Sequence, residues 1–113
     1  MNFEELQKRI IDIFKEGLER DNIKTNDDYF VMKIGEEVGE LVQSYLVYKK
    51  QCRPVKYLQD GEAKKAVAKE LSDVLALVFM IAHTLDINLE EAIEQKWITK
   101  EWLMKDNLAS PSA

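Results

Sequence analysis

Two short acidic motifs carry residue types that bind divalent cations. The first contains Glu36, Glu37 and Glu40, and the second contains Glu70 and Asp73. Glu37 and Glu40 are three positions apart, as are Glu70 and Asp73, so on a helix the members of each pair are surface neighbours. Carboxylate oxygens are the ligands that Mg²⁺ and Mn²⁺ prefer. The two motifs therefore indicate a site for a hard divalent cation, if two helices bring them together.

The second motif lies in an apolar sector of its predicted helix. At about 100° per residue, Glu70 and Asp73 share this sector with three aliphatic side chains, Val74, Leu77 and Ile81. An uncompensated buried ion costs roughly several kcal/mol even after relaxation, so these carboxylates need a nearby cation. An ion pair with Lys33 or Lys69 is one solution, and a metal ion shared with the first motif is the other.

The first motif by itself is less informative. Glu36, Glu37 and Glu40 share a sector of about 100° with Lys33 and Ser44, beside an apolar face, and many solvated surface helices have this pattern. Only the combination is specific, because four or five acids in one site repel each other unless a divalent cation lies between them.

Composition limits the chemistry further. The chain has 113 residues, of which 46% are hydrophobic and 33% charged, which predicts one globular domain. A net charge of −5 disfavours binding to nucleic acid or an anionic membrane. The one histidine, His83, argues against a zinc or di-iron site, and the one cysteine, Cys52, cannot form an intramolecular disulfide. No secretory segment is recognisable at the start, so we expect a cytoplasmic protein.

Helical periodicity runs through most of the chain and predicts an all-α fold. We expect helices over residues 2–20, 61–86 and 88–105. A further helix starts within residues 25–28 and ends at residue 50, and residues 51–61 form a longer connection. Side chains at 25–28, Asp60 and Asn88 with Glu91 are the predicted helix caps. Residues 1–106 then form a single domain, and 107–113 form a frayed tail.

The order and spacing of these residues resemble a known family. Glu36-Glu37-Val38-Gly39-Glu40 followed by Glu70-Leu71-Ser72-Asp73 is similar to the EExxE…ExxD signature of the MazG-like all-α nucleoside triphosphate pyrophosphohydrolases. The likeness covers residues 29–102. It implies a four- to five-helix bundle that uses Mg²⁺, with Mn²⁺ as a substitute, to cleave a nucleoside triphosphate between the α and β phosphates.

The resemblance also implies roles for individual residues. The metal ligands would be Glu37, Glu40, Glu70 and Asp73, and the catalytic residue, which orients the attacking water or helps to hold a metal, would be Glu36. Candidate substrate-binding residues are Lys33, Lys96 and Lys100 for the phosphates and Trp97, or Trp102, for the base. One departure concerns the last helix, because relatives often carry an asparagine soon after the position of Lys96, and this chain has none before Asn107.

Several functional alternatives stay open at this stage. The chain could clear non-canonical nucleotides, act on phosphoribosyl-ATP in histidine synthesis, or prefer dCTP or dUTP. A non-catalytic helical interaction module is the alternative of a different kind. An apolar helix in so small a chain has more apolar surface than its neighbours can cover, so we also expect a homodimer or homotetramer.

Overall fold

The structure is a computed structural model that describes residues 1–100 and 103, and every regular element in this part is a helix. In chain order the elements are α1 (Phe3–Arg20), α2 (Tyr29–Tyr48), the 3₁₀ turn η1 (Pro54–Lys56), α3 (Asp60–Thr84), α4 (Leu89–Ile93) and the π-helical segment η2 (Glu94–Ile98). The all-α prediction is confirmed. None of the described helices has the length and apolar character that crossing a membrane requires.

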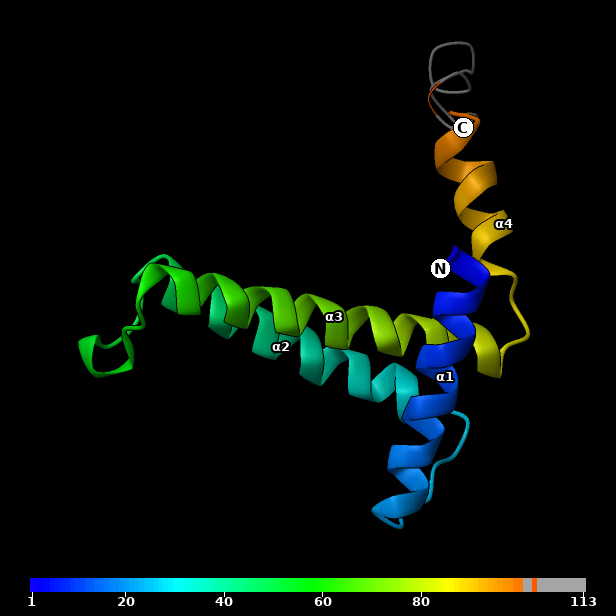
Figure 1. Ribbon diagram of the computed structural model, residues 1–113, viewed down its shortest axis with the longest axis horizontal. Coiled ribbons are helices and arrows are strands. Elements are labelled where there is room, and N and C mark those ends of the chain that lie inside the picture. Colours follow the sequence, from blue (N-terminus) through cyan, green and yellow to red (C-terminus); the bar gives the residue numbers. More distant parts are fainter. Residues whose placement is uncertain (101–102, 104–113) are drawn as a thin grey trace, which may run out of the picture.

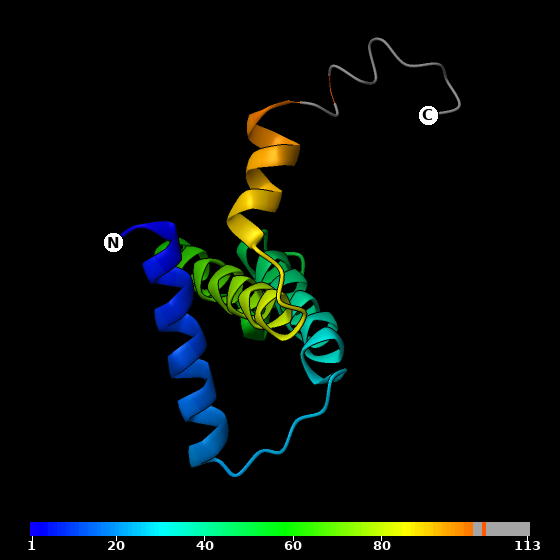
Figure 2. The same ribbon diagram turned by 90° about the vertical axis from the view of Figure 1, so that its right-hand side faces the viewer.

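The longest helices, α2 and α3, pack against each other as an antiparallel hairpin (Figure 1). Helix α1 crosses the end of the hairpin where α2 begins and α3 finishes. The segment formed by α4 and η2 projects away from the hairpin, as Figures 1 and 2 both show. The radius of gyration is 18.0 Å, compared with about 13 Å for a compact domain of this length. The arrangement is therefore open.

The hydrophobic core lies where α1 crosses the hairpin. Its buried side chains come from all three helices: Ile11, Phe30, Leu77, Phe79 and Met80. Two edge-to-face ring pairs stabilise the packing of α1 on the hairpin. The ring centroids of Phe3 and Phe79 are 5.6 Å apart, and those of Phe14 and Phe30 are 5.7 Å apart. Such pairs add roughly 0.5–1.5 kcal/mol each beyond the area that they bury. The core thus fixes one end of the hairpin, and the acidic motifs lie further along it.

Helix α2 begins at Tyr29, directly after the predicted capping segment 25–28, and Asp28 occupies the N-cap position without a side-chain cap hydrogen bond. The Asn26 side chain accepts a hydrogen bond from the Asp28 backbone N–H (3.1 Å) and holds a turn before the helix. The predicted cap of α3 is wrong. Asp60 is the first residue of α3 and not its cap, and Gln59 precedes it in extended conformation.

The Asn88 cap is confirmed, since its Oδ1 accepts from the Glu91 N–H at 3.0 Å. The predicted continuous helix over 88–105 is not regular, because its α-helical part ends at Ile93, a π-helical segment follows to Ile98, and Thr99 and Lys100 are not helical. Its predicted end at about residue 105 lies outside the described residues. The predicted tail over 107–113 lies outside the described residues.

Three helices end in the same way, with a non-glycine residue in the left-handed region. Asn22, Lys50 and Asp86 have φ of 55°, 56° and 54°. In each case the next residue donates its N–H back into the helix, for example Ile87 to the Ala82 carbonyl at 2.8 Å. This is the hydrogen bond of a Schellman motif, in which glycine is the favoured residue at the left-handed position.

Candidate metal centre

The hairpin brings the two acidic motifs together. One carboxylate oxygen from Glu37 of α2 and one each from Glu70 and Asp73 of α3 lie within 4.8 Å of one another. Neighbouring ligands of an octahedral Mg²⁺ ion, each 2.0–2.1 Å from it, are about 3 Å apart. The three oxygens would therefore have to move about 1–2 Å closer to one another to share one ion, which is within the reach of side-chain rotation. Three of the four predicted metal ligands meet as the spacing of the motifs suggested.

Two oxygens in this cluster have no partner. Glu37 Oε2 and Glu70 Oε2 are inaccessible to solvent and form no hydrogen bond. Leaving a buried acceptor unsatisfied costs about 1–3 kcal/mol, and more when it is charged. None of the ion pairs formed by described residues reaches Glu37, Glu70 or Asp73. The predicted alternative, neutralisation by Lys33 or Lys69, is therefore not found in this part of the chain.

The electrostatics of Glu37 agree with this geometry. Burial raises the pKa of the Glu37 carboxyl, and the proximity of Glu40 and the negative charges of Asp73 and Glu70 raise it further. All of these effects oppose the charged form, and a divalent cation at the same place would reverse them. The donor set consists of oxygen alone, which suits Mg²⁺ or Mn²⁺.

The remaining two acids of the first motif lie at the edge of this cluster. Glu40 is exposed, and it is close enough to Glu37 to influence its pKa. Glu36 is also exposed, and its Oε2 accepts a hydrogen bond from Lys33 Nζ at 3.1 Å. This contact with Glu36 raises the pKa of Lys33. Lys33 is thus engaged with Glu36 on the flank of the three-acid cluster.

The other predicted substrate-binding residues lie elsewhere. Lys96 and Trp97 belong to η2, which projects away from the hairpin, and Lys100 follows it (Figure 1). Lys96 Nζ lies 5.6 Å from the centroid of the Trp97 ring, a cation–π contact. None of these three residues lines either of the two cavities that the described residues form beside Glu36 and beside Glu40 and Glu70. Trp102 lies outside the described residues.

A cavity of about 610 Å³ adjoins the acidic cluster on the side of the loop between α2 and α3. Its lining comprises Glu40, Gln43, Ser44, Leu46, Val47, Cys52, Lys56 and Glu70. Glu70 therefore belongs to both the acidic cluster and the cavity. Lys56 lines this cavity but was not among the predicted site residues, and the length of the 51–61 connection is the one sequence feature that pointed to this loop.

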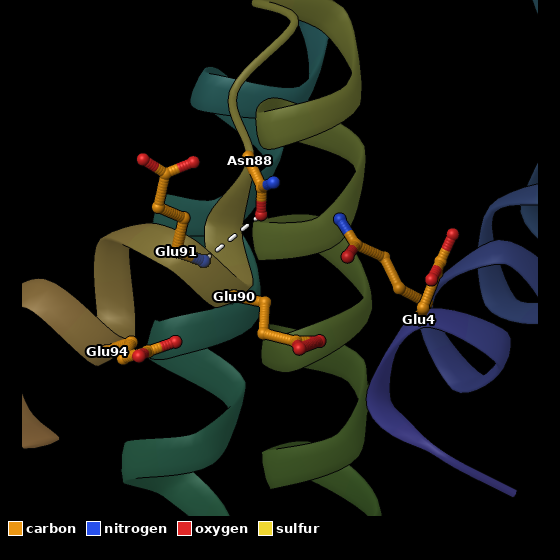
Figure 3. Close-up of a pocket in the computed structure, with 6 residues that line it drawn as sticks. Glu4, Asn88, Glu90, Glu91 and Glu94 are labelled. Carbon is orange, nitrogen blue, oxygen red and sulfur yellow. Dashed lines mark hydrogen bonds between the residues drawn. The ribbon is translucent and has the colours of Figure 1, made fainter.

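A second acidic pocket, of about 420 Å³, lies between the start of α1 and α4 (Figure 3). It contains Glu4, Glu90, Glu91 and Glu94, and the Asn88 side chain beside them is occupied as the cap of α4. These carboxylates are exposed, and none of their oxygens is buried without a partner. The pocket therefore lacks the feature that marks the cluster on the hairpin.

Comparison with known proteins identifies no relative. No family model matches the chain, and neither the curated proteins nor the solved structures provide a match. The geometry of the acids and the resemblance of their motifs are therefore the two independent supports for a function.

Proposed function

We propose that this chain is a Mg²⁺-dependent nucleotide pyrophosphohydrolase of the MazG-like type, which converts a (deoxy)nucleoside triphosphate to the monophosphate and pyrophosphate. One observation carries the proposal. Two antiparallel helices place the carboxylates of Glu37, Glu70 and Asp73 within 4.8 Å of one another, and two of their buried oxygens have no partner. A divalent cation would offset the mutual repulsion of these carboxylates, and the resemblance of the motifs indicates the reaction in which the cation would take part.

In this proposal Glu37, Glu70 and Asp73 hold the metal, and Glu40 completes the ligand set from the exposed edge. When bound, Mg²⁺ polarises the phosphoryl oxygens and lowers the pKa of a coordinated water. Glu36 orients the water that attacks the α-phosphorus. A new bond forms between the water oxygen and the α-phosphorus, the bond from the α-phosphorus to its bridging oxygen breaks, and its electron pair leaves with pyrophosphate. The proton of the attacking water is released to solvent. Little covalent chemistry is required of the protein, so positioning and charge neutralisation are its main contributions.

The test is pyrophosphate release from a panel of canonical and modified nucleoside and deoxynucleoside triphosphates with Mg²⁺. Glu70→Gln and Asp73→Asn should abolish release while the circular dichroism spectrum stays helical. An unchanged rate in either variant would reject its role as a ligand. Activity confined to phosphoribosyl-ATP, or to dCTP and dUTP, would select one of the narrower enzymes. Metal binding without any turnover would favour a non-catalytic helical module.

We also propose that the chain works as a homodimer or homotetramer. The hairpin leaves exposed apolar side chains at helical spacing on both helices: Val31, Val38, Val42 and Tyr45 on α2, and Leu71 and Leu75 on α3. A second hairpin packed on this face would complete a four-helix arrangement. Light scattering after size-exclusion chromatography should give a multiple of the 13.2 kDa chain mass, and a 13.2 kDa particle would contradict this part of the proposal.

A further inference from the structure

The cavity beside the acidic cluster has the size of a ligand site. Its volume of about 610 Å³ lies within the range of roughly 300–1,000 Å³ that is common for small-molecule pockets. Helix α2 forms one wall, Glu70 of α3 another, and the loop carrying Cys52 and Lys56 closes the third side. Because Glu40 and Glu70 line it, a molecule bound to the acidic cluster through a metal would extend into this cavity.

Lys56 is the one cation among the described residues that line the cavity. Its side chain forms no salt bridge or hydrogen bond, in contrast to Lys33, which pairs with Glu36, and Lys50, which pairs with Asp60. The backbone of Lys56 is held in place, since its N–H donates to the Arg53 carbonyl at 2.8 Å within η1. The cavity that Glu40 and Glu70 line therefore also contains an ammonium group whose hydrogen-bonding capacity is free.

Charge balance indicates what this ammonium group would bind. The acidic cluster already contributes several negative charges, and the phosphate chain of a nucleoside triphosphate brings several more. One or two Mg²⁺ ions cannot neutralise both sets. A lysine is a strong phosphate binder that acts as a point charge, and at this position it would offset the charge that remains.

We propose that Lys56 binds the β and γ phosphates of the substrate, and hence the pyrophosphate that leaves, across this cavity. This inference rests on the proposed function, because it takes the phosphate chain to be anchored at Glu70 and its neighbours. As the bond to the α-phosphorus breaks, negative charge accumulates on the pyrophosphate oxygens. Lys56 stabilises that charge and is a substrate-binding residue.

The test compares Lys56→Ala with Lys49→Ala, which removes the same charge from an exposed residue outside the cavity. Calorimetry measures the binding of pyrophosphate in the presence of Mg²⁺, and steady-state kinetics measures turnover. Lys56→Ala should weaken pyrophosphate binding about tenfold or more and raise KM for the triphosphate, because a charge-assisted contact is lost. Lys56→Arg should recover part of the affinity, and Lys49→Ala should match the wild type.

The two measurements separate the two ideas. Equal pyrophosphate affinity in Lys56→Ala and Lys49→Ala would overturn the role of Lys56, whether or not the enzyme turns over. If pyrophosphate affinity depends on Lys56 but the protein hydrolyses no nucleoside triphosphate, the binding role of Lys56 is supported and the proposed function is rejected. Since Lys56 is exposed, loss of its side chain should leave the helical circular dichroism signal unchanged.

Discussion

Replacing Glu37 by glutamine should stabilise the metal-free protein and remove most of its response to Mg²⁺. Glu37 contributes one buried, unpartnered oxygen to the cluster with Glu70 and Asp73. The substitution keeps the shape of the side chain, removes one of the repelling charges, and supplies an amide N–H₂ group that can donate to the neighbouring carboxylates. At a solvent-exposed glutamate that binds no metal, the same substitution would neither stabilise the metal-free protein nor reduce its response to Mg²⁺.

The magnitude follows from the distances. Two unit charges 4 Å apart repel by about 1 kcal/mol in water and about 4 kcal/mol at an effective dielectric constant of 20. The Glu37 oxygen lies within 4.8 Å of oxygens from two acids, and all three residues are half-buried. With about 1 kcal/mol for each pair, Glu37→Gln relieves about 2 kcal/mol. This corresponds to a rise in Tm of about 8 °C for a chain of this size.

The effect of the metal is of similar size. At a Mg²⁺ concentration ten times its Kd, binding adds about 1.4 kcal/mol to the free energy of unfolding, which is about 6 °C in Tm. In Glu37→Gln one charged ligand is missing, so the Tm increase at the same Mg²⁺ concentration should fall below about 2 °C.

Thermal unfolding followed by circular dichroism at constant protein concentration, with chelator and then with Mg²⁺, measures both quantities. Glu16→Gln is the matched control, because it removes the same charge from an exposed position on α1. It should show the wild-type response to Mg²⁺. Two results would contradict charge repulsion and metal binding at Glu37. One is a lower Tm of the metal-free Glu37→Gln variant, and the other is an equal stabilisation of wild type and variant by Mg²⁺.

Three further predictions follow from the structure. The pKa of Glu37 is raised in the folded state, so its contribution to the stability of the metal-free protein is present at low pH and is lost as the pH rises through that raised pKa. Chemical unfolding at a series of pH values should show this loss of unfolding free energy, and Mg²⁺ should suppress the loss. Glu36→Gln should lower kcat by about a hundredfold or more if Glu36 orients the water, while the unfolding free energy changes by less than about 1 kcal/mol since its ion pair is exposed. Asp86→Gly should raise the unfolding free energy by about 1 kcal/mol in urea titrations, since glycine adopts the observed φ of 54° without strain, and a loss of stability would contradict that.

The helical class and the meeting of the acidic motifs could both be predicted from sequence. Glu70 and Asp73 share a sector with residues such as Leu77, which is buried in the structure. The positions of Glu70 and Asp73 relative to these apolar residues therefore predicted which side of α3 packs against another helix. The i, i+3 spacing of Glu37 and Glu40 then identified the matching part of α2.

Local hydrogen bonds and loops account for what was missed. The Asn26 side chain holds a turn before α2 in place of a side-chain cap at Asp28, and no periodicity signals such a contact in advance. Lys96 and Trp97 continue a helical pattern, yet the segment that carries them projects away from the hairpin. Lys56 lies on a 3₁₀ turn without a hydrophobic repeat, so only the folded loop reveals that it lines the same cavity as Glu70.

The proposed function requires a divalent metal centre at Glu37, Glu70 and Asp73. Anomalous scattering from crystals grown with Mn²⁺ locates such an ion directly. We expect a peak within coordinating distance of carboxylate oxygens from all three residues. Manganese bound only at other positions, or the three carboxylates occupied by lysine side chains instead, would contradict it.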